Sequence, residues 1–353
     1  MLREKRRNIL WGTLTIVALA MLVGCLAVKK KTASKKIGEH QQQIAYLKKK
    51  NKKKTVKPKP FPEKSKEAKQ ATMDADFAQM NALGLYYDYH TLSLVDTVKA
   101  YLEEFGIDES QIAFSYKDLR SGKTVAMNEH QPMTAGSTYK LPLNMLVVDE
   151  VKKGKLTLTE RFDITGTDYE YEQEHNAYVA QFSGAMSIPD MQEYSLVYSE
   201  NTPAYALAER LGGMNKAYQL FDRYGKASGP IPTIDRKGNK TTTAYYLQVL
   251  DYLWKHQDKY ADILYFIGES FPDLYYKAYL PNITIYQKPG YVREALNIGA
   301  IVCEESPYLI ALYSAGLGGA TEESEEVNGL GYVQLINLTY VINEWHRVNH
   351  NMT

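Results

Sequence analysis

Cysteine and histidine are scarce in this sequence. Of the two cysteines, Cys25 lies in an apolar N-terminal run and Cys303 follows a strand-like stretch, so a disulfide between them is not expected. The seven histidines are scattered; His346 and His350 are four residues apart, but no third metal ligand is recognisable near them in the sequence. We therefore expect no metal site and no other cofactor.

Acidic and apolar residues are rare between positions 29 and 69. This segment has 16 lysines against three glutamates, with prolines at 58, 60 and 62. Too little apolar surface is available there to offset the entropy of folding, so we predict a disordered polybasic tether over residues 29–72. The tether is either a solvated spacer or a segment that binds anionic lipid headgroups or anionic wall polymers.

The charge of the chain is divided unevenly. Residues 1–69 contain 20 Lys and Arg against 4 Asp and Glu, whereas the remaining residues contain 22 and 37, although the net charge of the whole chain is +1. The lysine-dominated run has neither interleaved aromatic residues nor the arginine forks that read bases. It also follows an export signal, so no nucleic-acid partner is expected.

One long apolar run stands near the N-terminus. Residues 9–28 are 20 mostly apolar residues behind a basic run, long enough to cross a bilayer as a helix. We predict a signal anchor or, because Leu22-Val23-Gly24-Cys25 resembles a lipobox, a lipoprotein signal cut before Cys25. Either alternative predicts location at the cell membrane, on its extracytoplasmic face.

The folded part is predicted to span residues 73–353. Apolar periodicity predicts strands at both ends and helices between them, which makes an α/β (α+β) fold with an antiparallel sheet, terminal helices against it and an inserted helical lobe. The predicted strands are 112–116, 124–127, 283–287, 297–302 and 308–315. The predicted helices are 92–105, 139–151, 190–198, 202–211, 215–224, 242–254 and 332–345.

A Ser-x-x-Lys motif opens the first helix of the middle part. Ser137 and Lys140 are three residues apart, so their side chains share one face of a helix. A partly desolvated lysine can take the proton of a serine hydroxyl and make it a nucleophile. The free N–H groups of a helix start favour a developing oxyanion. The motif alone also fits an ordinary surface serine and lysine.

Two later clusters complete a pattern. Ser199-Glu200-Asn201 follows 62 residues after Ser137, and Lys288-Pro289-Gly290 follows 89 residues after Ser199. In this order the three motifs resemble those of the class A β-lactamases and penicillin-binding proteins. The likeness covers roughly residues 90–350 and implies a β-lactamase/transpeptidase-like fold.

The resemblance also implies roles for individual residues. Ser137 would be the acylated nucleophile, Lys140 its base, and Ser199 a proton shuttle towards the leaving nitrogen. Lys288 would supply positive charge opposite Ser199, and Asn201 would orient the substrate amide. The implied oxyanion hole consists of the N–H groups of Ser137 and of Tyr291, which follows Gly290.

The sequence departs from the family pattern at three places. Glu200 replaces the usual aspartate, and Pro289 replaces a residue whose hydroxyl helps to hold the substrate carboxylate, a contact that Arg293 could supply instead. The segment 226–240, where the family carries an Ω loop with a water-activating glutamate, contains no glutamate and only Asp235 as an acid. Deacylation is therefore expected to be slow.

These observations predict an extracytoplasmic serine hydrolase. The expected acyl donor is a D-alanyl amide or ester of the cell envelope or a β-lactam. One alternative is a true class A-type β-lactamase. The other is a catalytically degenerate module that binds envelope material.

Overall fold

The computed structural model describes residues 64–324 and 327–350. The predicted anchor, Cys25 and most of the predicted tether lie outside the described residues. Among the helices that are described, none is both long and apolar enough to span a bilayer.

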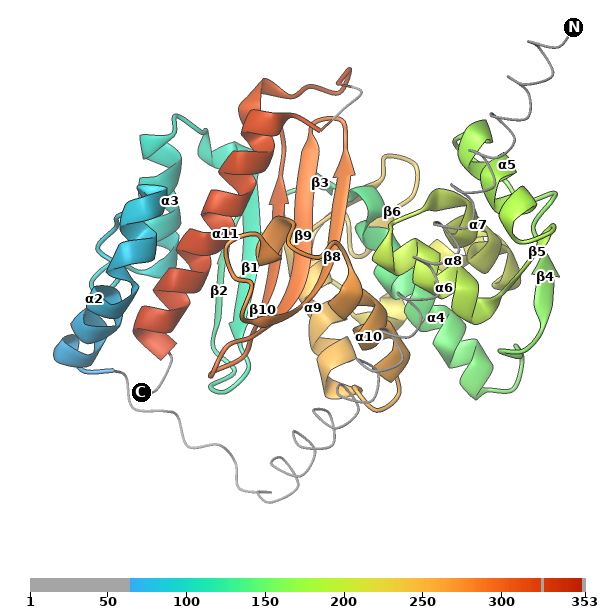
Figure 1. The fold of residues 1–353 in the computed structure, drawn as a ribbon, viewed down its shortest axis with the longest axis horizontal. Coiled ribbons are helices and arrows are strands. Elements are labelled where there is room, and N and C mark those ends of the chain that lie inside the picture. Colours follow the sequence, from blue (N-terminus) through green and yellow to red (C-terminus); the bar gives the residue numbers. More distant parts are fainter. Residues whose placement is uncertain (1–63, 325–326, 351–353) are drawn as a thin grey trace, which may run out of the picture. The chain divides into compact units, whose positions relative to one another are not determined.

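A five-stranded antiparallel sheet combines strands from the early and the late part of the folded chain, as predicted (Figure 1). The strand order is β2-β1-β10-β9-β8, so the first hairpin pairs with the last strand, with Ile112 opposite Ser314. The strands are β1 (Ile112–Asp118), β2 (Thr124–Met127), β8 (Thr284–Val292), β9 (Ala295–Cys303) and β10 (Tyr308–Ser314).

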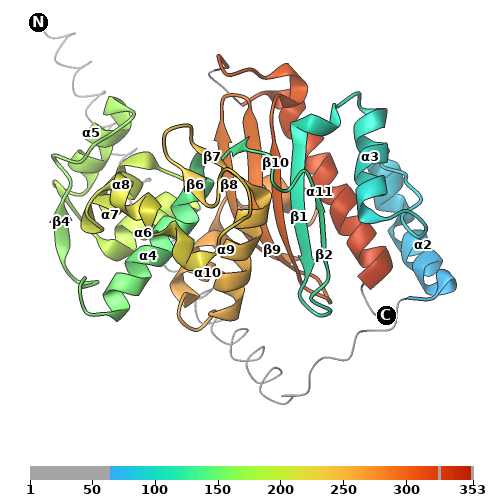
Figure 2. The same cartoon turned by 180° about the vertical axis from the view of Figure 1, so that it is seen from behind.

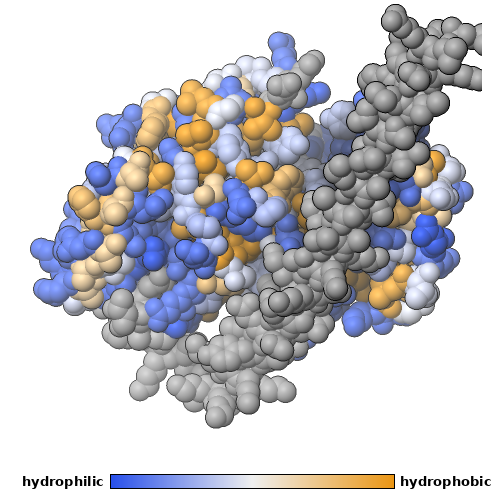
Figure 3. Space-filling model, in the orientation of Figure 1, coloured by the Kyte–Doolittle hydropathy of each residue, from blue (hydrophilic) through white to orange (hydrophobic). Residues whose placement is uncertain are grey.

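Both faces of the sheet are covered, which explains why its central strands β10 and β9 are almost entirely buried. On one face lie α2 (Lys66–Leu83), α3 (Leu94–Glu104) and α11 (Gly329–His350). On β10 the side chains alternate: Tyr308, Ile310 and Leu312 pack towards these terminal helices, whereas Leu309, Ala311 and Tyr313 pack towards the middle of the chain. Figure 3 shows hydrophilic and hydrophobic residues mixed over the outer surface of this layer.

The middle of the chain covers the other face and builds a helical lobe (Figure 2). Helix α9 packs directly on β1, β9 and β10, and α10 packs on β8. The helices of this part are α4 (Lys140–Lys152), α5 (Glu172–Gln181), α6 (Ile188–Val197), α7 (Asn201–Arg210), α8 (Met214–Gln219), α9 (Thr243–Lys255) and α10 (Ala261–Glu269). Short strands accompany them: β3 (Met133–Thr134), β4 (Arg161–Asp163), β5 (Ala185–Ser187), β6 (Ile234–Asp235) and β7 (Lys240–Thr241).

Several predicted boundaries differ from the structure. Strand β8 ends at Val292 and not at the predicted 287, and α11 extends beyond the predicted 332–345 at both ends. Helix α2 begins at Lys66, inside the segment 29–72 predicted to be disordered, because Ser65 caps its N-terminus and Gly84 ends it in a left-handed conformation. The helix predicted over 215–224 is instead divided into α8 and the 3-10 helix η3 (Phe221–Tyr224).

Candidate active site

The Ser-x-x-Lys motif lies in a 3-10 turn, η2 (Gly136–Tyr139), that runs directly into α4. Ser137 is therefore in the turn, and Lys140 is the first residue of the α-helix. Pro142 is the third residue of α4, in its first turn, where proline is tolerated. The Thr138 carbonyl, four residues before the proline, accepts from the Tyr246 hydroxyl instead.

Buried side chains from the sheet and from α9 hold this turn. The Tyr313 hydroxyl donates to Thr138 Oγ1 at 2.7 Å, and the Tyr246 hydroxyl donates to the Thr138 carbonyl at 3.1 Å. Asn297 Nδ2 donates to the Thr134 carbonyl at 2.7 Å from β9. These buried bonds fix the backbone on both sides of Ser137, which is what a nucleophile must have to meet its substrate in one geometry.

The turn and strand β8 touch through two glycines. Gly136 has φ of +55°, and a Cβ on it would lie 3.0 Å from both the Gly290 carbonyl carbon and the Tyr291 nitrogen. A Cβ on Gly290 would lie 2.7 Å from the Ala135 carbonyl oxygen. Side chains at either glycine would push the strand away, so this close approach keeps Tyr291 N beside the Ser137 turn.

Two buried lysines meet at Ser199. Lys140, which is fully buried, donates from Nζ to the Ser199 carbonyl and to Asn201 Oδ1, the latter at 2.6 Å. Lys288, also fully buried, donates to Ser199 Oγ at 2.8 Å and to the carbonyl of Pro289 at 2.8 Å. The three sequence motifs therefore converge, although they are far apart in the chain.

Ser199 adopts an uncommon backbone conformation. Its φ of +65° is in the left-handed region, which costs a residue with a side chain about 1 kcal/mol or more. This conformation accompanies the placement of its carbonyl on Lys140 and its hydroxyl on Lys288. Ser137 Oγ, in contrast, makes no hydrogen bond to Lys140 within the described residues.

The buried position of the lysines changes their protonation. Burial lowers the pKa of Lys140 to about 8, although the negative charges of Glu174, Glu170 and Glu200 oppose that change. Burial, and then the charge of Lys140, hold the pKa of Lys288 well below its ordinary value. Neutral amines are thus accessible near neutral pH at this site.

Glu174 on α5 joins the site, and the sequence reasoning missed it. Its Oε1 accepts the backbone N–H groups of Asn201 at 2.9 Å and Thr202 at 2.6 Å, and so caps α7 from outside. Burial first, and then the charge and hydrogen bond of Glu174, raise the pKa of Glu200. The two carboxyl groups can form that bond only when one of them is protonated.

A weak signal for Glu174 exists in the sequence. Acidic residues recur at every second position between 168 and 174, between the first two motifs. No periodicity marks which of them turns inward, because α5 buries only His175 and Tyr178. Its role depends on a contact with a segment 27 residues away in the chain.

Three further residues named from the sequence, Arg293, Tyr291 and Asp235, are exposed at the surface. Arg293 is exposed in the tight turn between β8 and β9, with φ of +51°, and not on a strand. Tyr291 is 46% exposed beside Gly290. Asp235 is exposed on β6, where its carboxylate accepts from the N–H of Lys237 in its own turn.

Pro289 lies in β8, opposite Ile298 of β9. Among the described residues, strand β8 is at the edge of the sheet and pairs only with β9, so a missing N–H is tolerated on its other side. Of the tyrosines next to the motifs, Tyr139 and Tyr286 are buried in the core, whereas Tyr198 is 51% exposed.

The sheet, the helical lobe and the serine-lysine turn where they meet have the class A β-lactamase fold, as the sequence predicted. A sequence model of the β-lactamase enzyme family matches residues 93–332, more than half of the chain. The chain belongs to the β-lactamase enzyme family. No curated protein sequence matches it significantly.

Solved structures with the same fold are distant in sequence. A class A β-lactamase of the last common ancestor of Gram-negative bacteria has a TM-score of 0.58 at 17% identity, covering 71% of this chain and 98% of its own. A β-lactamase from Xanthomonas campestris pv. campestris has a TM-score of 0.57 at 20% identity, covering 72% of this chain and 96% of its own. A β-lactamase from Burkholderia vietnamiensis has a TM-score of 0.58 at 20% identity, covering 73% of this chain and 98% of its own.

Proposed function

We propose that the protein is an extracytoplasmic serine hydrolase that is acylated at Ser137 by a D-alanyl amide or ester of the cell envelope, or by a β-lactam, and deacylates slowly. The observation that carries the proposal is the convergence of Lys140, Ser199 and Lys288 beside the Ser137 turn. The proposed location rests on the apolar run and the lysine-rich segment of the sequence.

In the acylation step, Ser137 Oγ attacks the carbonyl carbon of the donor. Neutral Lys140 takes the hydroxyl proton, and Ser199 relays a proton to the leaving nitrogen or oxygen as the bond to carbon breaks. The N–H groups of Ser137 and Tyr291 stabilise the oxyanion. Because apo sites often tighten only around a substrate, the missing Ser137–Lys140 hydrogen bond is compatible with this route.

Substrate placement falls to residues around this centre. Asn201, next to Lys140, orients the substrate amide, while Lys288 donates a hydrogen bond to Ser199 Oγ and so holds the hydroxyl in place. The exposed Arg293 offers a cation for a substrate carboxylate, in place of the hydroxyl that Pro289 removes. Slow deacylation follows from the segment 226–240, whose single acid, Asp235, is exposed and bonded within its own turn.

A second candidate function is β-lactamase activity with fast deacylation. Family membership and the Glu174–Glu200 carboxyl pair, which influences Lys140, favour it. A third candidate is a binding module without turnover, favoured by Pro289 in the position of a substrate-binding hydroxyl.

A time course with a fluorescent penicillin tests these alternatives. The intact mass of the protein is followed after mixing, together with the appearance of hydrolysed product. We expect an adduct of one penicillin that persists while little product forms. A transient adduct with accumulating product supports the β-lactamase, and no adduct contradicts acylation by β-lactams.

The Glu174→Gln variant should shift the pH dependence of acylation. Glutamine keeps an oxygen that can accept from Asn201 and Thr202, but it removes a negative charge that raises the pKa of Lys140. Lys140 then loses its proton at lower pH. The acidic limb of the pH–rate profile, where the acylation rate rises with pH, should therefore shift to lower pH by about half a unit to one unit. Stopped-flow measurement of the acylation rate between pH 5 and 9 gives the position of that limb.

Glu172→Gln is the matched control. Glu172 is exposed on the same helix, so its replacement should leave the limb where it is in the unmodified protein. A limb that stays in place or moves up in Glu174→Gln would show that Glu174 does not act on the base.

A further inference from the structure

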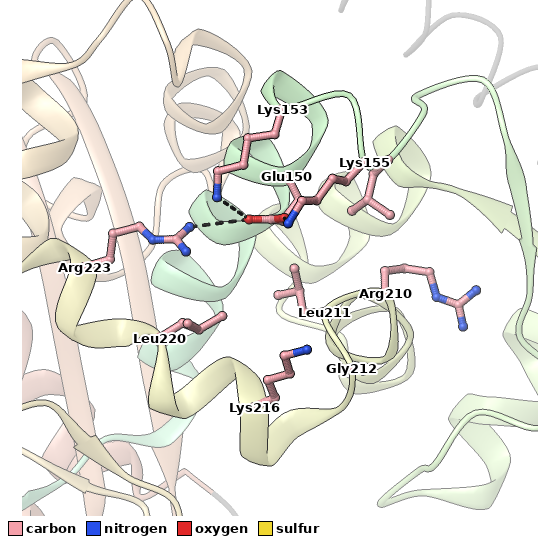
Figure 4. Close-up of a pocket in the computed structure, with 10 residues that line it drawn as sticks. Glu150, Lys153, Lys155, Arg210, Leu211, Gly212, Lys216, Leu220 and Arg223 are labelled. Carbon is pink, nitrogen blue, oxygen red and sulfur yellow. Dashed lines mark hydrogen bonds and ion pairs between the residues drawn. The ribbon is translucent and has the colours of Figure 1, made fainter.

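A pocket lies at the far end of the helix that begins with Lys140. Its volume is about 390 Å³, and it is lined by the ends of α4 and α7, by α8 and by η3 (Figure 4). Glu150 in its wall is ten residues beyond Lys140 on α4, which is about 15 Å along the axis. The pocket is therefore separate from the candidate active site.

Positive charge is concentrated in this pocket. Its lining includes five basic residues and one acid: Lys153, Lys155, Arg210, Lys216, Arg223 and Glu150. Three of the cations share that acid, because Glu150 is 2.6 Å from Lys153, 3.3 Å from Lys155 and 3.7 Å from Arg223. One carboxylate can neutralise only one of these three charges.

Lys216 adds an uncompensated cation on the opposite wall. It is exposed, and within the described residues its ammonium has no hydrogen bond or ion pair. Arg210 is different: Figure 4 shows its guanidinium directed away from the pocket, and it pairs with Glu209 at 3.1 Å and stacks on the Phe162 ring. Four cations thus remain around the opening.

Nearby acids offset only part of this excess. Asp149 pairs with Arg223 at 2.9 Å and with Lys259, so the carboxylates of Glu150 and Asp149 face five cations: Lys153, Lys155, Lys216, Arg223 and Lys259. Residues beyond position 69 contain 22 basic and 37 acidic side chains, so a basic pocket is unusual on this domain. An anion repelled by most of the domain surface would be attracted here.

Part of the pocket lining is apolar. Leu156, Leu211 and Leu220 line it together with the charged residues. A pocket with both cations and leucines in its lining suits an anionic group that carries carbon on at least one side. Donors from several directions, including a guanidinium that can bind two oxygens, match a tetrahedral phosphate better than a planar carboxylate.

We propose that this pocket binds a phosphodiester of glycerol-phosphate size, from an envelope polymer or from a lipid headgroup. Lys153, Lys155, Lys216 and Arg223 contact the phosphate oxygens, and the leucines contact the glycerol carbons. The pocket anchors the domain to phosphate-bearing material independently of acylation at Ser137.

The test measures binding by the full chain, kept in solution with a neutral detergent. Isothermal titration with glycerophosphoglycerol is compared between the unmodified protein and the variants Lys216→Gln and Lys153→Gln/Lys216→Gln. We expect saturable, salt-sensitive binding that each variant weakens about tenfold or more, the effect of losing a charge-assisted hydrogen bond. Lys216→Gln removes no hydrogen bond or ion pair within the described residues, so its effect does not come from unfolding.

Two controls complete the test. The double variant Lys66→Gln/Lys123→Gln removes two exposed lysines elsewhere and should bind normally. Vesicles of phosphatidylglycerol, compared with phosphatidylcholine, identify the source: binding of vesicles alone that depends on Lys216 assigns the lipid headgroup. Equal weakening in pocket and control variants, or no Lys216-dependent binding of either probe, overturns the proposal.

Discussion

The Ser137→Ala variant is expected to form no covalent adduct with a fluorescent penicillin. In the proposed reaction the acyl group bonds to Ser137 Oγ, and no other hydroxyl can replace that atom in the turn between β3 and α4. Loss of a nucleophilic serine from such an assembly lowers turnover by more than about 10³-fold. Intact-mass analysis and in-gel fluorescence after equal exposure measure the loss.

The structure predicts that this substitution leaves the fold intact. Ser137 Oγ makes no hydrogen bond within the described residues, while the turn is held by Thr138, Tyr313 and Asn297. The change in unfolding free energy should therefore stay within about 0.5 kcal/mol. Ser228→Ala, at an exposed serine, is the matched control and should label normally. Labelling that survives Ser137→Ala would assign the acyl group to another residue.

Much of the sheet could be predicted from the sequence. Strands β1, β9 and β10 are buried on both faces, so most of their residues are apolar and turn residues separate them clearly. Helices α3, α4, α6, α7 and α9 begin and end within two residues of their predicted bounds. Such helices bury many apolar residues, and their periodicity follows from that burial.

Three helices, α2, α5 and α10, were not predicted from the sequence. Helix α2 buries only Lys69 and Met80, and α5 buries only His175 and Tyr178, so neither shows a broad apolar face. The lysines before α2 made the segment resemble the tether. Helix α10 has an apolar face but was not among the predicted elements.

The residues of the candidate site that belong to short sequence motifs could be predicted. The predicted sites at Ser137, Lys140, Ser199, Asn201, Lys288 and Gly290 come together in the structure. Glu174, Asn297 and Tyr313 act on the same centre through contacts between distant segments. No pattern in one sequence encodes those contacts, because they depend on how the sheet packs against the lobe.

Replacing Lys140 by methionine should lower the acylation rate by about 10² to 10⁴-fold, the usual contribution of a positioned general base. In the unmodified protein the rate should rise with pH up to about 8 and level off above it, because burial lowers the pKa of Lys140 to about 8 and only the neutral amine accepts a proton. This limb should be absent in Lys140→Met. Single-turnover kinetics with a chromogenic cephalosporin between pH 5 and 9 provide both quantities.

Lys140 is also part of the contacts that shape the site, so a loss of rate alone does not identify it as the base. Its ammonium contacts the Ser199 carbonyl and Asn201 Oδ1, and methionine leaves both acceptors without that donor. A structural effect would slow acylation at every pH and keep the limb, whereas loss of the base removes the limb itself. Lys152→Met, at the exposed end of the same helix, should preserve rate and limb. A limb near pH 8 in Lys140→Met would assign proton transfer to another group, with Lys288 as the nearest candidate because it bonds Ser199 Oγ.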